Sequence, residues 1–561
     1  VSLPALAERD SVPRATTSGL WRPSLPPGST VPPDTSDPEH KKPRPSRLFW
    51  AGRASFDFWP GRASDMSYSS SLSFGRGGAR MLTAREILCE RVQPAHIRAC
   101  SVWDVMKGFG AVLRNNAVLT QEMHDNMSRA VESIDDFISH SWRQPRARKL
   151  LALALVYNFS AAVVAAALGG LLGFVLHLTD VLPNPDSAIS LDESGEPTGY
   201  GAQIFGNAMF ILTLVCWGDL RHLCCGGSAP VVFFDKYCIN QSDLEAKKEG
   251  IKSLGGTIAH SKRLVILSSR SYFTRLWTVF EIACFMSVHT FDCLVFMPEA
   301  IPRVLIVNVV LFMFVKLTYN ASLLYFGGVW LTRIWSFLAV GCMVGIVSVL
   351  IILRGAAEES ASLQRVLSAF TIQATQCHDE SDRLLVQGHV AMLELSLRKD
   401  REDNFSEEQA LDSFNTRVQE ELAPAVLLNL GRHCLPYKVM AACAVSSCLD
   451  GVDTLAVALH GGAVRYGVLN FLTGLEQTFL SFPLMTIFLN SLAARRLDMR
   501  RGRLTELMFI VASSVAALPA IFAFLGLPVL LKRLAYESDV YAAALCAWVL
   551  LELVTTLRLF R

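Results

Sequence analysis

Residues 230–298 have the sequence PVVFFDKYCINQSDLEAKKEGIKSLGGTIAHSKRLVILSSRSYFTRLWTVFEIACFMSVHTFDCLVFMP. This is the longest stretch of the chain with the composition of a soluble α/β unit. Short apolar runs at residues 231–234, 263–267 and 291–297 alternate in it with two helical segments, a pattern typical of parallel βαβ units. Each run ends in small or polar residues. In a parallel sheet, ligand-binding loops lie at these strand ends.

The composition of the whole chain indicates a membrane protein. Of its 561 residues, 51% are hydrophobic and 18% are charged, which suits several membrane spans and one modest soluble unit. The net charge of +2, without a basic stripe carrying interleaved aromatic residues, gives no indication of a nucleic-acid partner. The 14 cysteines lack paired CxxC spacing, so we expect buried thiols rather than disulfides or a zinc site.

The first part of the chain contains a disordered segment and the start of the soluble domain. Residues 1–80 hold 11 of the 24 prolines and are rich in Ser, Gly and Arg, which predicts disorder. Val1 stands at the start, which is consistent with a fragment or with translation from Met66 or Met81. Residues 82–136 favour short amphipathic helices that lead into a strand centred on Phe137 and Ile138. We expect residues 82–142 and 218–298 to form one domain, interrupted by residues 150–217.

Residues 150–217 are predicted to form an inserted membrane hairpin. Its apolar spans, residues 150–178 and 200–217, are long enough to cross a bilayer. The loop between them is acidic and lacks Lys and Arg, whereas Arg143, Arg146, Arg148 and Lys149 precede the first span. By the positive-inside rule, the basic side and the soluble domain are cytoplasmic.

The remainder of the chain favours six more spans and a helical region. We expect a transmembrane hairpin at residues 304–353, a cytoplasmic helical region at residues 355–433 and a C-terminal bundle of about four spans at residues 439–557. Ser406 and Gln409 form a capping-box pattern at the start of a helix. The predicted topology is an integral, multi-pass protein with roughly eight spans and both termini in the cytoplasm.

Three segments of the soluble domain together resemble the TIR (Toll/interleukin-1 receptor) fold. They are FISHSWR, FFDKYCINQ and RLVILSSRSYFTRLWTVFEIACF. The DxxCINQ strand end is similar to that of TIR-like relatives and of fungal heterokaryon-incompatibility domains. The resemblance implies an α/β flavodoxin-like, TIR-type parallel sheet, here short and interrupted by a membrane hairpin, beside a multi-span α-helical membrane domain.

The chain departs from the TIR pattern in three places. Thr278 stands where the family has Cys. The helix that follows the first strand is expected to be replaced by the membrane hairpin. After Met297 the chain enters the membrane, so the later helix and the fifth strand are expected to be absent or rebuilt.

The resemblance implies a catalytic role for Glu281, the position of the glutamate in TIR domains that cleave NAD. A carboxylate there would stabilise the oxocarbenium-like ribose, as in glycoside hydrolysis. Trp277 lies four residues before Glu281 and therefore on the same helix face. The alternative is a carboxylate that pairs with Arg275 or Lys262 in a domain without enzymatic activity.

Polar residues at the strand ends are candidates for binding the substrate. The candidate substrate-binding residues are Ser139, His140, Ser141, Trp142, Asp235, Lys236 and Trp277. Residues 139–142 could equally cap the strand and pack, and Asp235 could fix the turn that follows it. NAD is expected only as a substrate, without a bound cofactor or metal, and Cys377–Glu380 is expected to be a solvated helix face.

Two classes of function remain open for the soluble domain. A third class depends only on the predicted membrane spans. The domain could cleave NAD, or it could associate with other copies without chemistry. The expected partners are the lipid bilayer and a second copy of the chain, through the TIR-like domain or the helix face of Gly341 and Gly345. A channel or transporter is the third alternative, for which Lys316 and Glu476 would be the intramembrane charges.

Overall fold

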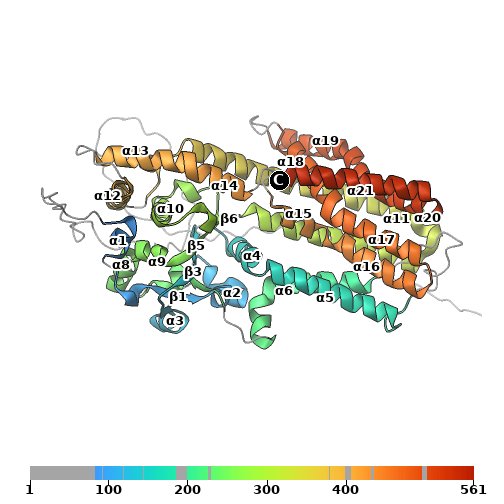
Figure 1. The fold of residues 1–561 in the computed structure, drawn as a ribbon, viewed down its shortest axis with the longest axis horizontal. Helices are drawn as coiled ribbons and strands as arrows, with labels where there is room; N and C mark the ends of the chain where they lie inside the picture. The colour runs from blue at the N-terminus through green and yellow to red at the C-terminus, as the bar shows by residue number, and fades with distance from the viewer. Residues whose placement is uncertain are drawn as a thin grey trace, which may run out of the picture. The chain divides into compact units, whose positions relative to one another are not determined.

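The computed structural model describes residues 82–560, except residues 91, 116, 118, 143, 185–198, 225–228, 378, 399–405, 431–434 and 496–501. The predicted disordered segment, residues 1–80, lies outside the described residues, as does Arg143. The described chain is mostly helical, with one mixed sheet of six strands (Figure 1).

Four parallel strands form the centre of the sheet. They are β3 (Ile134–His140), β4 (Val231–Phe233), β5 (Ser261–Ser268) and β6 (Leu294–Pro298), in the spatial order β4-β3-β5-β6. In the register, Phe137 of β3 lies beside Phe233 of β4 and Leu264 of β5. When the four parallel strands are numbered by their order in the chain, they therefore lie side by side in the order 2-1-3-4. Each contains one of the apolar runs found in the sequence.

The sheet is mixed, which corrects the expectation of an entirely parallel sheet. Strands β1 (Arg98–Ser101) and β2 (Arg129–Ala130) precede β3 in the chain, and β1 pairs antiparallel with both β2 and β4. The sequence indicated only helices there, because these two strands are short and lack a run of β-branched residues. Since β1 covers the edge of β4, the backbone groups of β4 are paired on both sides.

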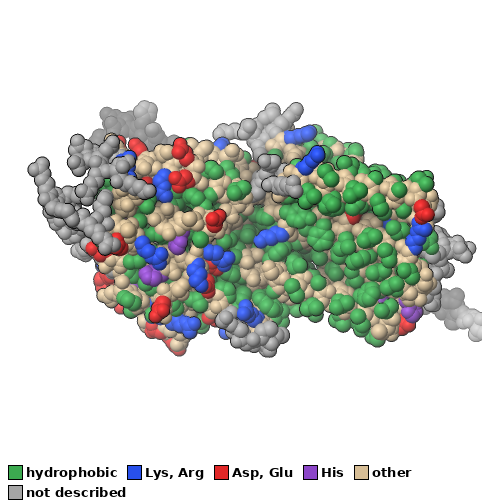
Figure 2. All heavy atoms as spheres, viewed as in Figure 1, with side chains coloured by type: hydrophobic (Ala, Val, Ile, Leu, Met, Phe, Trp, Pro, Cys, Tyr) green, Lys and Arg blue, Asp and Glu red, His purple; other side chains and the backbone are tan. Residues whose placement is uncertain are grey.

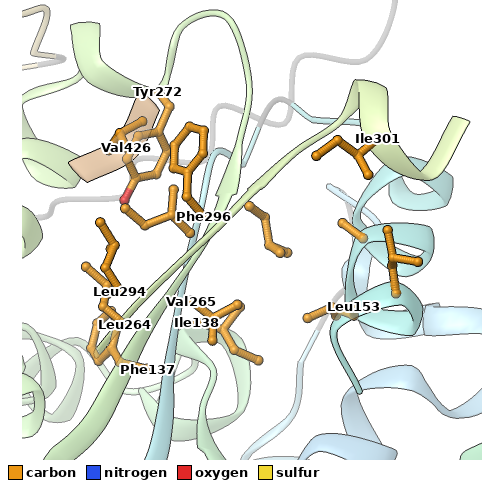
Figure 3. Packing of buried hydrophobic residues seen from close by; sticks show 14 of the residues in the cluster. Phe137, Ile138, Leu153, Leu264, Val265, Tyr272, Leu294, Phe296, Ile301 and Val426 are labelled. Carbon is orange, nitrogen blue, oxygen red and sulfur yellow. The ribbon is translucent and has the colours of Figure 1, made fainter. Parts of the chain in front are cut away.

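Helices cover the sheet and fill its core. Figure 3 shows Ile138 and Val265 on the side of the sheet that faces Leu153 of α4 (Arg146–Tyr157). Phe137 and Leu264 lie on the opposite side, because successive strand residues alternate between faces. Helices α9 (Leu254–Ala259) and α10 (Leu276–Val288) pack together in this core. The remaining helices of the N-terminal segment are α1 (Ala84–Cys89), α2 (Val102–Gly110) and α3 (Gln121–Met127).

Helix α4 differs from the expected first span. Residues 150–178 form two helices, α4 and α5 (Phe159–Leu178), separated at Asn158, whose side-chain amide donates to Leu214 O at 2.8 Å. The Tyr157 hydroxyl donates to Asp136 Oδ2 of β3 at 2.9 Å, which holds α4 against the sheet. The helix after the first parallel strand is therefore present and is not replaced by the hairpin. An apolar helix under a sheet and one in lipid have the same composition, so the sequence did not separate them.

Six helices or helix runs in the described chain are long and apolar enough to cross a membrane, and a bent pair would make seven. The six are Phe159–Leu178, Gly201–Arg221, Ala300–Thr318, Val464–Ala493, Leu504–Tyr536 and Asp539–Phe560. The bent pair is α15 (Tyr437–Cys443) and α16 (Val445–His460), with an angle of 48°. Figure 2 shows hydrophobic side chains gathered over α5, α16, α17, α20 and α21, while charged side chains lie mainly over the sheet region.

The helices of this apolar region have the following bounds: α6 (Gly201–Cys224), α11 (Ala300–Ser368), α17 (Val464–Glu476), α18 (Phe482–Ala493), α19 (Arg503–Ile521), α20 (Leu527–Glu537) and α21 (Asp539–Phe560). Helix α11 folds back on itself, because a Cβ placed on Gly345 would lie 2.9 Å from the Leu311 side chain. In a straight helix these residues would be about 50 Å apart. Gly345 is therefore packed within the chain, whereas the packing of Gly341 lies outside the described residues.

The helical region after α11 packs against the sheet unit. It contains α12 (Glu380–Leu397), α13 (Glu407–Arg417), the π-turn η8 (Val418–Leu422) and α14 (Ala423–Leu430). The Gln376 backbone bonds with Thr274 and Leu276 beside α10, and Arg417 donates to Met286 O at 3.0 Å. The Ser406 capping box is present at the start of α13. This region and the sheet therefore form one packed unit.

Candidate functional site

The candidate site lies at the carboxyl end of the parallel strands. Ser139 and His140 are the last two residues of β3, Asp235 follows β4, and Tyr272 follows β5. Glu281 comes from α10. The structure brings these residues together because parallel strands present their carboxyl ends at one edge, where open α/β sheets bind ligands.

Glu281 is bonded to a buried pair of hydroxyls. Ser139 Oγ donates to Glu281 Oε2 and lies 2.5 Å from the Tyr272 hydroxyl oxygen. Burial raises the pKa of Glu281 to about 8, the Ser139 hydrogen bond opposes the shift, and the nearby Asp235 charge adds to it. Glu281 is therefore mainly a neutral acid at pH 7 when no ligand is bound.

Trp142, Asp235 and Lys236 form a second group at the same edge. The Trp142 indole Nε1 donates to Asp235 Oδ2 at 2.6 Å, and the Lys236 backbone N–H donates to Asp235 Oδ1 at 2.7 Å. The Lys236 ammonium lies 4.8 Å from the centre of the Trp142 ring and donates to the backbone carbonyls of Val112 and Arg114. Asp235 thus fixes its own turn, as the alternative interpretation expected, and also orients Trp142.

Lys149 is a candidate that the sequence analysis missed. It lies in the first turns of α4, its side chain is fully buried, and its Nζ lies 3.4 Å from Asn115 Oδ1. Burial lowers the pKa of Lys149 to about 8, with Asp235 opposing the shift and Lys236 adding to it. It is therefore mostly cationic at pH 7. A basic residue at the start of the helix after the first strand was the available sequence signal.

Several buried polar atoms in the β3–α4 loop have no hydrogen-bond partner among the described residues. They are His140 Nε2, Ser141 Oγ and both amide atoms of Gln144. The His140 ring stacks between Phe234 and Trp142, with ring centres 5.2 and 6.5 Å away. Burial and the charges of Lys149 and Lys236 lower the pKa of His140, so the ring is neutral. A buried polar group without a partner costs about 1–3 kcal/mol, so this group of atoms indicates a place for ligand or water.

Trp277 lies away from this group. Its Nε1 donates to Asp382 Oδ2 of α12 at 3.1 Å, and its ring contacts Phe280 edge-on. These contacts place the Trp277 ring against α12 and against its own helix. Lys262, considered as a partner of Glu281, instead pairs with Asp135 at 2.7 Å.

In the part of the chain that the structure describes, there is no group of three or more His, Cys, Asp or Glu side chains that could hold a metal ion. The Cys377 thiol and Arg383 both bond to Glu380 near the start of α12. No family model, curated protein or solved structure matches this chain.

Proposed function

We propose that this chain is a membrane-embedded signalling protein whose cytoplasmic TIR-like unit cleaves NAD through Glu281. The observation that carries the proposal is the convergence of Ser139, Asp235 and Glu281, from three separate elements, at the carboxyl edge of the sheet. The strand order 2-1-3-4 supports the resemblance, since flavodoxin-like sheets have the order 2-1-3-4-5.

The charges at this edge suit a dinucleotide. Lys149 and Lys236 place two ammonium groups beside the β3–α4 loop, where a diphosphate would meet cations and a helix N-terminus. The buried polar atoms of Ser141 and Gln144 supply hydrogen-bonding groups in the same loop. The partly exposed Trp142 ring would contact a base or the nicotinamide ring.

The reaction would break the bond between ribose C1′ and the nicotinamide nitrogen. The bonding electrons leave with the nitrogen, so the positively charged ring departs as neutral nicotinamide. The cationic C1′ centre is stabilised by the Glu281 carboxylate until the oxygen of a water molecule binds to it. The water then loses one proton, and the second product is ADP-ribose. Ser139, held by Tyr272, would orient the carboxylate.

Glu281 must be ionised for this role, although burial favours its neutral form. The positive nicotinamide ring favours the carboxylate when the substrate is bound, because an opposite charge nearby lowers the pKa of an acid. Binding the substrate would therefore activate the site.

The test follows the loss of NAD in membranes that contain the full chain. We expect Glu281→Gln to lower the rate at least about 100-fold, the usual effect of removing one electrostatic stabiliser. Glu249→Gln, on the half-exposed side of α8 (Leu244–Lys252), is the matched control and should retain the wild-type rate. Equal rates for the wild type and Glu281→Gln would contradict the enzymatic proposal.

Association without chemistry is the second candidate. It is favoured by the neutral, hydrogen-bonded state of Glu281, which suits a structural group as well as a catalytic one. In that case, neither the wild type nor Glu281→Gln consumes NAD, while both proteins form the same oligomers in crosslinking experiments on membranes.

A further inference from the structure

We propose that Glu476, Ser481 and Glu552 form a proton-binding site among the apolar helices. Glu476 ends α17, Ser481 ends the π-turn η9 (Gln477–Ser481), and Glu552 lies on α21 (Figure 1). All three side chains are buried, with exposed fractions of 5%, 0% and 2%. The site involves none of the residues at the edge of the sheet, so the proposal is independent of NAD cleavage.

The hydrogen bonds require a proton at this site. Ser481 Oγ bonds with Glu476 Oε1 and lies 2.7 Å from Glu552 Oε1. The serine hydroxyl has one hydrogen, and an ionised carboxylate can only accept. Both contacts are satisfied when at least one carboxyl is a neutral acid that donates to Ser481 Oγ. Ser481 then donates its own hydrogen to the other carboxyl.

The surroundings favour the same state. Among the described residues, no Lys or Arg forms an ion pair with Glu476 or Glu552, and both lie in helices long and apolar enough to span a membrane. Two neighbouring ionised carboxylates without a cation would be strongly unfavourable there. The second oxygen of each carboxyl has no partner among the described residues, nor has Thr556 Oγ1 one turn along α21. A proton, or a water molecule that carries it, would also bind at these buried atoms.

The π-turn explains how one helix supplies two of the three groups. Residues five positions apart are separated by about 140° around an α-helix, at about 100° per residue. The wider i→i+5 turn between Glu476 and Ser481 brings them to one face, where they bond to each other and to Glu552. Single π-turns inside α-helices are often found at functional sites.

Dicyclohexylcarbodiimide tests the proposal, because it reacts with neutral carboxylic acids in apolar surroundings. The acid adds across one C=N bond, with its proton going to nitrogen and its oxygen to carbon, and the adduct rearranges to an N-acylurea without losing atoms. With the full chain in membranes, we expect mass spectrometry to find the adduct on Glu476 or Glu552. The yield should fall as the pH rises, and the double variant Glu476→Gln/Glu552→Gln should show at least tenfold less labelling in these helices.

Asp453→Asn provides the matched control, since Asp453 is a buried acid on α16 that accepts two backbone N–H bonds and lies outside the proposed site; labelling of Glu476 and Glu552 should be unchanged in this variant. Infrared spectroscopy provides a measurement that does not depend on access for the reagent. A carboxylic-acid C=O band present in the wild type should be missing in the double variant. If the two proteins have the same infrared bands, the site holds no proton and the proposal fails. If sodium, but not potassium, suppresses labelling at constant pH, the site binds a metal cation and the proposal is equally overturned.

Discussion

Lys316 and Asp450 form an ion pair across two helices, with Nζ and Oδ2 2.6 Å apart and 134 positions between them in the sequence. Gln203 of α6 donates to the other oxygen of Asp450 at 2.5 Å. The sequence offered Lys316 as an isolated intramembrane charge on a transport path. The structure pairs Lys316 with Asp450, so these two charges join the helices that carry them.

Asp453, one turn further along α16, caps another helix. Its two carboxylate oxygens accept the backbone N–H groups of Ala202 at 2.6 Å and Gln203 at 2.9 Å, in the first turn of α6. A negative charge is stabilised at a helix N-terminus, where the N–H groups lack partners. These contacts explain how a segment with two aspartates fits among apolar helices.

The first prediction concerns the Lys316–Asp450 pair. Lys316→Met leaves Asp450 without its cation. The two side chains are 24% and 23% exposed, so we expect a loss of about 1–3 kcal/mol in stability, more than for a surface pair and less than for a fully buried one. The double variant Lys316→Met/Asp450→Asn should recover most of that loss. Thermal unfolding in detergent measures both effects. Equal stability of the single variant and the wild type would show that the pair does not hold the helices together.

The second prediction concerns the pH dependence of NAD cleavage. The free protein holds the Glu281 proton up to a pKa of about 8, and only the carboxylate is active in the proposed reaction. We therefore expect kcat/KM to rise about tenfold per pH unit below 8 and to level off above it, since this ratio reports the free enzyme. A profile that is flat between pH 6 and 9 would contradict the assignment of Glu281.

The third prediction concerns Lys149. Lys149→Met removes a cation from the proposed diphosphate site, so we expect KM for NAD to rise about 10- to 100-fold, the value of one charge-assisted hydrogen bond. We expect only a small change in the melting temperature, because Lys149 forms no ion pair with a described residue and its bond to the exposed Asn115 side chain is long, at 3.4 Å. Lys252→Met on the exposed side of α8 is the control. An unchanged KM would remove Lys149 from the site.

The fourth prediction concerns the ion pair that neutralises Asp136, the residue of β3 to which Tyr157 of α4 bonds. Arg263 of β5 binds the fully buried Asp136 with Nε to Oδ1 at 2.7 Å and Nη2 to Oδ2 at 2.9 Å. Arg263→Ala leaves that carboxylate unpaired, so we expect a destabilisation of about 3–5 kcal/mol.

Lys262→Ala, at the adjacent position, is the matched control for Arg263→Ala. Lys262 pairs with Asp135 at the surface, and such a pair contributes about 0–1 kcal/mol. Denaturant titration of the full chain in detergent measures both variants. If the two substitutions cost the same, the Arg263–Asp136 pair does not anchor the sheet.

The sequence by itself located the parallel strands and most apolar helices, because both signals are local. A short β-branched run such as Val231–Phe233 predicts a strand wherever it packs, and the composition of Asp539–Phe560 suits lipid without reference to any neighbour. The positions of Ser139 and Glu281 in the TIR pattern predicted that the two residues would lie at one site. The pattern did not predict the hydrogen bond between them or the contact of Ser139 with Tyr272.

Only the tertiary structure decided which apolar helix lies under the sheet and which charges are paired. Leu150 and Leu153 look alike in sequence whether they face a sheet or lipid, and it is the bond from Tyr157 to Asp136 that places α4. The antiparallel strand β1 depends on the free edge of β4, and Lys149 became a candidate only through its burial beside Asp235. In each case the residue that determines the structure lies far away in the chain, so a local sequence pattern does not predict the contact.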